Sequence, residues 1–177
     1  MKIKVEKTAS RGIAVAKIYK YGELDLKPVQ YKVPADKKKE QLDKFLDARE
    51  CVRGELEELA ASNEIFSAHM EMVMDFTLED SVTSKINNNS ENAETAVSEA
   101  ISEVAAVFGM MDDEYMKERA ADIQDVGKRL MAQLKGVKLP DIGSLDEEAI
   151  ILAKDLFPSD TVKINTDYVK GIITEEG

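Results

Sequence analysis

One histidine and one cysteine, His69 and Cys51, limit the chemistry that this chain could perform. A zinc site needs three or four cysteine, histidine or carboxylate ligands, and a di-iron bundle needs paired Glu-x-x-His motifs. A serine or cysteine nucleophile would need His69 as its base, and nothing near His69 in the sequence indicates one. The stretches GELDLK and GVKLPDIG lack the spacing of a phosphate-binding loop. We therefore expect no catalysis by this chain alone.

His69 lies in the segment EIFSAHMEMVMDF, which has helical periodicity. At about 100° per residue, Ile65, His69, Met72 and Phe76 share one helix face. One interpretation is a buried or half-buried histidine that is bonded to a neighbouring polar group. The other is a residue at the margin of a bundle that faces a partner, where an imidazole could accept a phosphoryl group or transfer a proton. The spacing does not decide between them.

Arg119 is the most unusual polar residue, because the helical wheel of residues 113–135 places it inside the apolar stripe, between Tyr115 and Ile123. A buried guanidinium needs a partner. Either Arg119 pairs with a carboxylate inside the bundle, or the stripe is partly exposed and Arg119 meets another molecule.

Methionines gather in two places, near residues 70–74 and near residues 110–116. Methionine fills irregular gaps in cores, and methionine clusters also suit adaptable binding surfaces. Glu64, Glu71 and Asp75 border the apolar face of the first of these segments. An apolar strip with an acidic border suits a basic partner, but an ordinary amphipathic helix has the same pattern.

The elements that would position these residues follow from hydrophobic periodicity. Alternation predicts strands near residues 2–7 and 13–21, and apolar runs predict strands at 149–153 and 169–174. Helical periodicity predicts long helices at 36–60, 64–76, 91–108 and 113–135, and a weak short helix at 79–86. A further short helix is expected in FPSDTVKIN, with Ser159 as its N-cap.

This order predicts a mixed α+β fold in which one domain interrupts another. An antiparallel four-helix bundle, residues 34–139, is inserted into an α/β domain that is formed by residues 1–33 and 140–177. Such an insertion is tolerated because the termini of a domain are often close together.

Composition restricts the partners. The chain has 35 acidic and 24 basic residues and a formal net charge of −11, which argues against nucleic acid or an anionic membrane. The charge fits a basic partner, or serves solubility alone. The single cysteine indicates a reducing compartment. The N-terminus has no apolar signal region, and no apolar run approaches the roughly 20 residues of a membrane span, so we expect a cytoplasmic protein.

Several segments resemble one bacterial family. DDEYMKERAADIQDVGKRLM, residues 112–131, closely resembles enzyme I of the sugar phosphotransferase system, the phosphoenolpyruvate–protein phosphotransferase. EIFSAHMEMVMD, SRGIAVAKIY and AIILAKDLFPSDTVKIN are similar to further segments of that family, in the same order. The resemblance therefore covers nearly the whole chain.

The resemblance implies a function. Enzyme I takes a phosphoryl group from phosphoenolpyruvate onto a histidine and passes it to the small carrier HPr. Its N-terminal half is an α/β phosphohistidine domain interrupted by a helical bundle that binds HPr. The active histidine of the family follows a strand similar to GIITEEG, so we expect the chain to stop before it. Magnesium and phosphoenolpyruvate bind in a C-terminal part of the family's proteins, which also forms their homodimer, so we expect this chain to be monomeric and to hold no cofactor.

The resemblance also implies site residues. No catalytic residue is expected in this chain, but Thr161 matches a threonine that hydrogen-bonds the active histidine. His69 has a counterpart that is not the phosphorylated residue. The residues implied to contact HPr are Ile65, Ala68, Met72, Phe76, Leu78, Phe108, Met111, Tyr115 and Arg119. The alternative function is that of a stand-alone helical regulatory or scaffold protein that binds a basic partner.

Overall fold

The computed structural model describes residues 9–22 and 24–175, which divide into two compact units. The helical unit comprises residues 24–139 and 157–159. The sheet unit takes its described residues from both ends of the chain, 9–22, 140–156 and 160–175. Residues 24–33 and 157–159 thus group with the helices, although the sequence placed both with the α/β domain.

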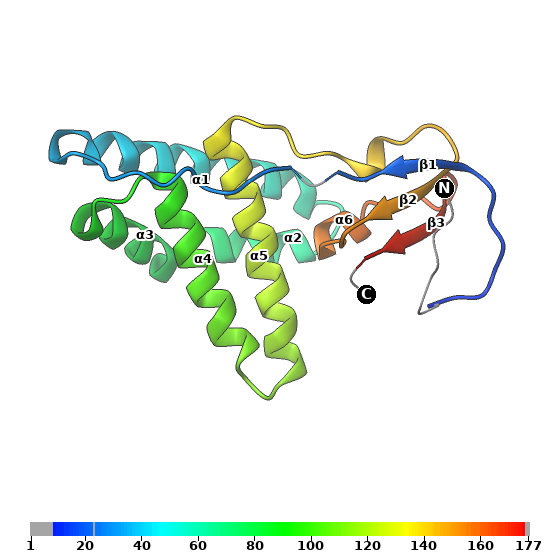
Figure 1. Ribbon diagram of the computed structural model, residues 1–177. Helices are drawn as coiled ribbons and strands as arrows, with labels where there is room; N and C mark the ends of the chain where they lie inside the picture. The colour runs from blue at the N-terminus through cyan, green and yellow to red at the C-terminus, as the bar shows by residue number, and fades with distance from the viewer. Residues whose placement is uncertain (1–8, 23, 176–177) are drawn as a thin grey trace. The chain divides into compact units, whose positions relative to one another are not determined.

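The helical unit contains five α-helices among the described residues (Figure 1). After the 3₁₀ turn η1 (Ala35–Lys37) come α1 (Lys38–Ala60), α2 (Ile65–Val73), α3 (Phe76–Asn89), α4 (Ala93–Gly109) and α5 (Glu114–Lys135). The bundle therefore exceeds the four helices predicted, because the weak helix expected at 79–86 is the 14-residue α3. Among the described residues, no helix is both long enough and apolar enough to span a membrane.

Helix α3 is longer than predicted because its ends are well defined. Asp75 is the N-cap, and its side chain accepts a hydrogen bond from the backbone N–H of Thr77 at 2.6 Å. Leu78, Val82 and Ile86 follow at intervals of four and are buried. Ser90 then ends the helix in the left-handed conformation, with φ of 57°.

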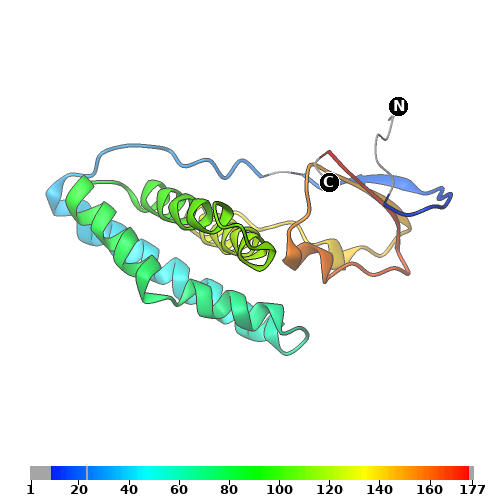
Figure 2. The ribbon, with the colours of Figure 1, turned by 90° about the horizontal axis from the view of Figure 1, so that it is seen from below.

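One core holds the helices together. In Figure 2, α4 and α5 lie side by side and α1 runs along α2 and α3. Gly127 of α5 permits the close approach of α4, because a Cβ there would lie 2.6 Å from Cγ2 of Ile101. The largest fully buried apolar side chains of this core are Phe45, Val52, Leu56, Phe66, Val73, Val82, Ile86, Val97 and Leu130.

The described residues of the sheet unit form three parallel strands in the order β1 (Lys17–Lys20), β2 (Ala149–Ala153) and β3 (Val169–Thr174). The predictions for 149–153 and 169–174 are confirmed. The strand expected at 13–21 is shorter, and the one expected at 2–7 lies outside the described residues. The prediction of Ser159 as an N-cap is wrong, because α6 (Pro158–Thr161) already begins at Pro158, whose fixed φ suits a first helical turn.

Candidate functional site

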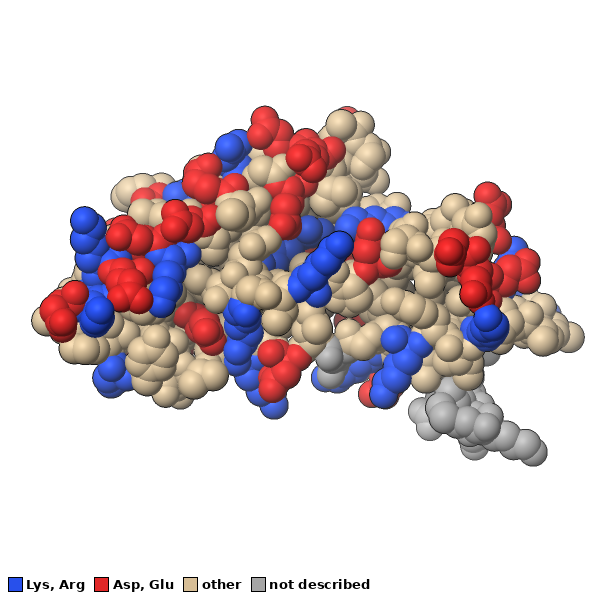
Figure 3. Space-filling view, turned by 90° about the horizontal axis from the view of Figure 1, so that it is seen from above, with Lys and Arg blue, Asp and Glu red and all other residues tan. Residues whose placement is uncertain are grey.

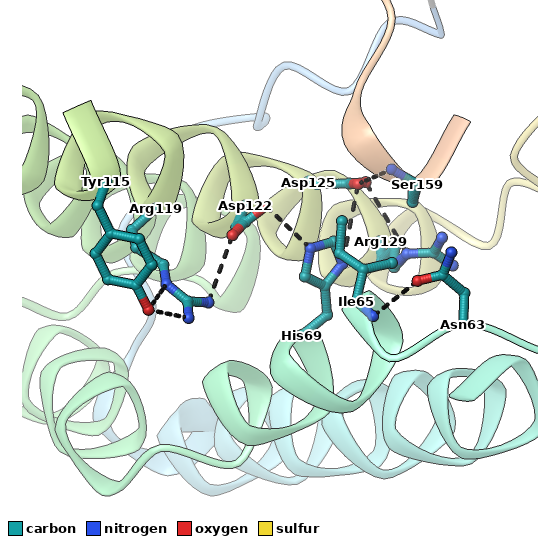
Figure 4. A network of polar contacts seen from close by, with 9 residues as sticks. All are labelled: Asn63, Ile65, His69, Tyr115, Arg119, Asp122, Asp125, Arg129 and Ser159. Carbon is teal, nitrogen blue, oxygen red and sulfur yellow. Dashed lines mark hydrogen bonds and ion pairs between the residues drawn. The ribbon is translucent and has the colours of Figure 1, made fainter. Parts of the chain in front are cut away.

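A row of polar side chains lies along α5 where it faces α2 (Figure 4). His69 of α2 is fully buried, and its Nε2 lies 3.3 Å from Oδ1 of Asp122. The ring packs edge-on against Phe66, with ring centroids 6.2 Å apart and planes at 87°. The first interpretation of His69, a buried residue bonded to a neighbouring polar group, describes this position.

Arg119 fulfils the first alternative that the sequence left open, pairing inside the bundle, and is also partly exposed. Its Nη1 lies 3.5 Å from Oδ2 of Asp122, so it pairs with a carboxylate of the bundle. Its Nε and Nη2 donate to the hydroxyl of Tyr115 at 3.2 and 2.6 Å. Its side chain nevertheless keeps 28% of its surface exposed. The pKa of the guanidinium lies above its ordinary value, first through the hydrogen bond to Tyr115 and then through the charges of Asp122 and Glu71. Arg119 is therefore a fixed cation that remains accessible.

The row continues deeper into the helical unit. Asp125 is buried, accepts a hydrogen bond from the backbone N–H of Ser159 at 3.0 Å, and lies 4.0 Å from Nε of Arg129. The guanidinium of Arg129 lies over the ring of Phe66, 5.8 Å from its centroid. Two carboxylates, Asp122 and Asp125, thus lie between two cations, Arg119 and Arg129, along α5, and the buried charges are partly compensated by their neighbours.

Sequence reasoning missed Arg49, which fixes the junction between α2 and α3. Its Nε and Nη2 donate to the backbone carbonyls of Val73 and Met74 at 2.9 and 2.8 Å, and its Nη1 donates to Glu79 at 2.7 Å. The carbonyls at the end of a helix lack partners within the helix, and α2 has no basic residue in its last turn. Arg49 of α1 supplies that cation.

The residues that the resemblance implied as contacts lie on α2, α3, α4 and α5, except Met111, which lies in the connection between α4 and α5. Phe76, Met111 and Tyr115 are 76%, 39% and 55% exposed. Half-buried are Ile65, Ala68, Met72, Phe108 and Arg119. The backbone N–H of Ile65 is fixed by the side chain of Asn63 at 3.0 Å, which orients the start of α2.

Two implied residues lie elsewhere. Leu78 is only 3% exposed and belongs to the apolar core, so its side chain is not on the surface; its interval of four to Val82 and Ile86 explains this burial. Thr161 is exposed at the end of α6 and belongs to the sheet unit.

The structure adds two exposed apolar side chains that sequence reasoning did not select. Val107 and Met110, at the end of α4 and just after it, are 58% and 84% exposed. Their position after the last buried residue of α4, Ala105, was the available signal.

Charged side chains of both signs are interspersed on the face drawn in Figure 3, so neither sign forms an uninterrupted field there. Among residues 9–22 and 24–175, no three histidine, cysteine or carboxylate side chains come together as metal ligands could. The exposed apolar side chains Phe76, Met111 and Tyr115 and the ordered Arg119 are side chains of the kinds that contact other proteins.

The chain is similar to known proteins over most of its length. Residues 7–119 match the sequence model of the family described as PEP-utilising enzyme, N-terminal. A phosphoenolpyruvate-protein phosphotransferase of Bacillus subtilis is 42% identical over 178 residues, which cover 96% of this chain and 31% of that protein. The corresponding protein of Listeria monocytogenes is 40% identical with the same coverage. The chain thus spans 31% of the length of these curated relatives.

Two solved structures are also similar. The solution structure of an enzyme I protein matches with a TM-score of 0.80 at 34% identity, covering 94% of this chain and 71% of that one. A structure described as the N-terminal domain of Enzyme 1 - Nitrogen matches with a TM-score of 0.65 at 22% identity, which supports the fold alone.

Proposed function

Because this chain belongs to the family of N-terminal domains of PEP-utilising enzymes, and within it to enzyme I, we propose that its helical unit docks the phosphocarrier HPr. The chain then serves as the N-terminal part of a phosphoenolpyruvate–protein phosphotransferase in sugar uptake. This function is cytoplasmic, in agreement with the single cysteine of the chain.

The docking face consists of Ile65, Ala68, Met72, Phe76, Phe108, Met111, Tyr115 and Arg119. One observation carries the proposal: Arg119 is held by Tyr115 and Asp122 and is still 28% exposed. Exposed aromatic and methionine side chains beside an ordered arginine are the composition of binding hot spots. A surface that served only the stability of the bundle would have no need to keep Phe76 and Tyr115 exposed.

Electrostatic attraction supports a basic partner. The net charge of −11 gives a long-range field that accelerates association with a cationic protein. Near the docking face, Glu71 is exposed and acts on Arg119 through its charge. We expect the association rate to fall with salt more than the dissociation rate rises.

Titration of the ¹⁵N-labelled chain with purified HPr of Bacillus subtilis tests the proposal. We expect chemical-shift changes on α2 and on the first half of α5, and smaller changes in the sheet unit. Arg119→Ala should weaken binding about tenfold or more, since truncated arginine hot spots cost more than 1–2 kcal/mol. Arg53→Ala, which removes an arginine of α1 that forms exposed ion pairs with Glu50 and Glu57 of the same helix, is the matched control and should leave binding unchanged.

Two results would contradict the proposal. The first is the absence of shift changes on α2 and α5 at millimolar HPr. The second is equal weakening by Arg119→Ala and Arg53→Ala, which would indicate a general charge effect in place of a docking residue. Thermal melts of each variant verify that the bundle remains folded.

The proposal assigns magnesium to phosphoenolpyruvate binding by another part of the enzyme, and dimerisation to that part as well. HPr docking by this chain, as a monomer, should therefore be the same in excess EDTA and in millimolar magnesium. A magnesium requirement would reveal a metal-dependent step in docking itself.

A further inference from the structure

His69 is fully buried beside Asp122 and is not one of the residues that form the docking face. The imidazole is fully buried, and its Nε2 lies 3.3 Å from Oδ1 of Asp122. An ionised carboxylate only accepts hydrogen bonds, so Nε2 carries the proton in this contact. The other ring nitrogen, Nδ1, finds no hydrogen-bond partner in the described part of the chain and lies 3.9 Å from Oδ2 of Asp125. The one hydrogen bond of the ring is therefore directed at Asp122.

Asp122 divides its two carboxylate oxygens between two neighbours. Oδ1 faces His69 and Oδ2 faces Nη1 of Arg119 at 3.5 Å. The side chain of Asp122 is 13% exposed, so water contributes little to its orientation. The hydrogen bond from His69 to Oδ1 fixes the orientation of the Asp122 carboxylate. That orientation in turn determines the position of Oδ2 relative to the guanidinium of Arg119.

Arg119 is then fixed from two sides. Tyr115 accepts from Nε and Nη2 at 3.2 and 2.6 Å, and Asp122 faces Nη1 (Figure 4). A long arginine side chain otherwise loses rotamer freedom when it binds a partner, which reduces affinity. A guanidinium that is oriented before binding avoids this loss.

We propose that His69 is a positioning residue: through Asp122 it orients the guanidinium of Arg119 for a hydrogen-bond acceptor of the docked partner. The inference rests on the proposed function and extends the docking face by two residues that do not touch the partner. In this role, His69 affects the affinity for the partner only through Arg119.

A purely structural role for His69 predicts something else. The ring packs against Phe66 inside the core and would stabilise the bundle whatever Arg119 does. Both roles predict a lower melting temperature for a variant without the ring. Only the positioning role predicts that the effect on binding disappears when Arg119 is absent.

A double-mutant cycle separates the two roles. His69→Met introduces an apolar side chain of similar length and removes the donor to Asp122, while His69→Gln keeps an N–H donor near the position of Nε2. We expect His69→Met to raise the Kd for HPr about twofold to tenfold, the equivalent of releasing one long side chain, and His69→Gln to have less effect. In the Arg119→Ala background, His69→Met should change the Kd no further.

Asp122→Asn provides a second variant if His69→Met fails to fold. Asparagine can still accept from His69 through its oxygen, but its amide then directs donors at a guanidinium that has only donors. We expect the loss in HPr affinity seen for His69→Met, with a smaller loss of stability. Equal effects of His69→Met or Asp122→Asn with and without Arg119 would overturn the proposal.

A measurement without HPr keeps this inference distinct from the docking proposal. In the free 177-residue chain, the Nε–H signal of Arg119 should be resolved and slow to exchange with water. It should remain so in His69→Gln and be lost to rapid exchange in His69→Met. If the chain does not bind HPr and the signal behaves in this way, the docking proposal fails and the positioning role stands. If the signal is the same in all three proteins, the positioning role is wrong whether or not HPr binds.

Discussion

Replacing Arg49 by methionine should destabilise the helical unit far more than its place among the polar residues of α1 suggests. Arg49 donates to the carbonyls of Val73 and Met74 and to Glu79, and its side chain is 9% exposed. The same substitution at Arg53, one turn later in α1, removes two exposed ion pairs of 2.9 Å. The two variants therefore differ in burial and in the acceptors they leave behind.

The magnitude follows from these acceptors. Each hydrogen bond from a charged donor contributes about 1.5–3 kcal/mol, which gives about 3–6 kcal/mol for the two carbonyls. Val73 is fully buried, so its carbonyl gains little from water, whereas Met74 is only half-buried and Glu79 is 37% exposed. We therefore expect about 3–4 kcal/mol for Arg49→Met, near the lower end of that range, and no measurable loss for Arg53→Met, whose ion pairs are exposed.

Urea unfolding followed by circular dichroism at the helical minimum measures both values, and the helical unit dominates that signal. For a chain of this size, about 3–4 kcal/mol corresponds to a fall of about 10 °C in Tm. Arg49→Lys should lie between Arg49→Met and wild type, because an ammonium keeps the charge but cannot reach three acceptors in the geometry of a planar fork. If Arg49→Met and Arg53→Met unfold at the same urea concentration, the hydrogen bonds at the α2–α3 junction are not a source of stability.

Three further predictions concern packing, capping and titration. Gly127→Ala should lower the stability by about 1–2 kcal/mol in chemical denaturation, since overpacking against Ile101 outweighs the helix propensity of alanine, and Ile101→Ala should cost less in the Gly127→Ala chain than in the wild type. Asp75→Ala should cost about 1 kcal/mol in the same assay because it removes the N-cap of α3, whereas Asp75→Asn should cost less. The pKa of Glu40 should lie below its ordinary value in an NMR titration, because Lys44 bonds the ionised carboxylate. The pairing is therefore present above that pKa and is lost as the pH falls through it. Lys44→Met should raise the pKa of Glu40 most of the way back to its ordinary value.

The sequence was sufficient for the elements whose pattern and boundary signals agree. Residues 149–153 and 169–174 form the predicted strands because short apolar runs there are bounded by charged residues. The helix predicted to end at residue 135 does end there, because Gly136 follows in the left-handed conformation with φ of 63°. Helix α3 was underestimated because NNN has low helix propensity, which tertiary packing of Ile86 overrides.

The candidate site could be predicted only in part. The wheel of α5 located Arg119 within an apolar stripe, but the partner of a buried cation depends on which helix packs against it. Asp122 lies three residues after Arg119 and was not selected, since its second contact, His69, lies on another helix. Arg49 stands at the corresponding place in α1, between Phe45 and Val52, and the same wheel argument could have found it.

The contacts of Arg49 and those of His69 with Asp122, both missed from the sequence, are related to the partly exposed Arg119. A seam between α2 and α5 filled with apolar side chains would hold the helices at least as well as one that buries His69 and Asp125, because charges lose hydration on burial. Apolar side chains have no hydrogen-bond acceptor, so an apolar seam could not orient the guanidinium of Arg119 at the surface as Asp122 does. Arg49 donates to the carbonyls at the C-terminal end of α2, and His69, in the middle of α2, contacts Asp122 of α5. Helix α2, which carries Ile65, Ala68 and Met72, is therefore held at two points relative to Arg119. The polar contacts between α2 and α5 thus relate the position of the apolar side chains of α2 in the proposed docking face to the position of Arg119.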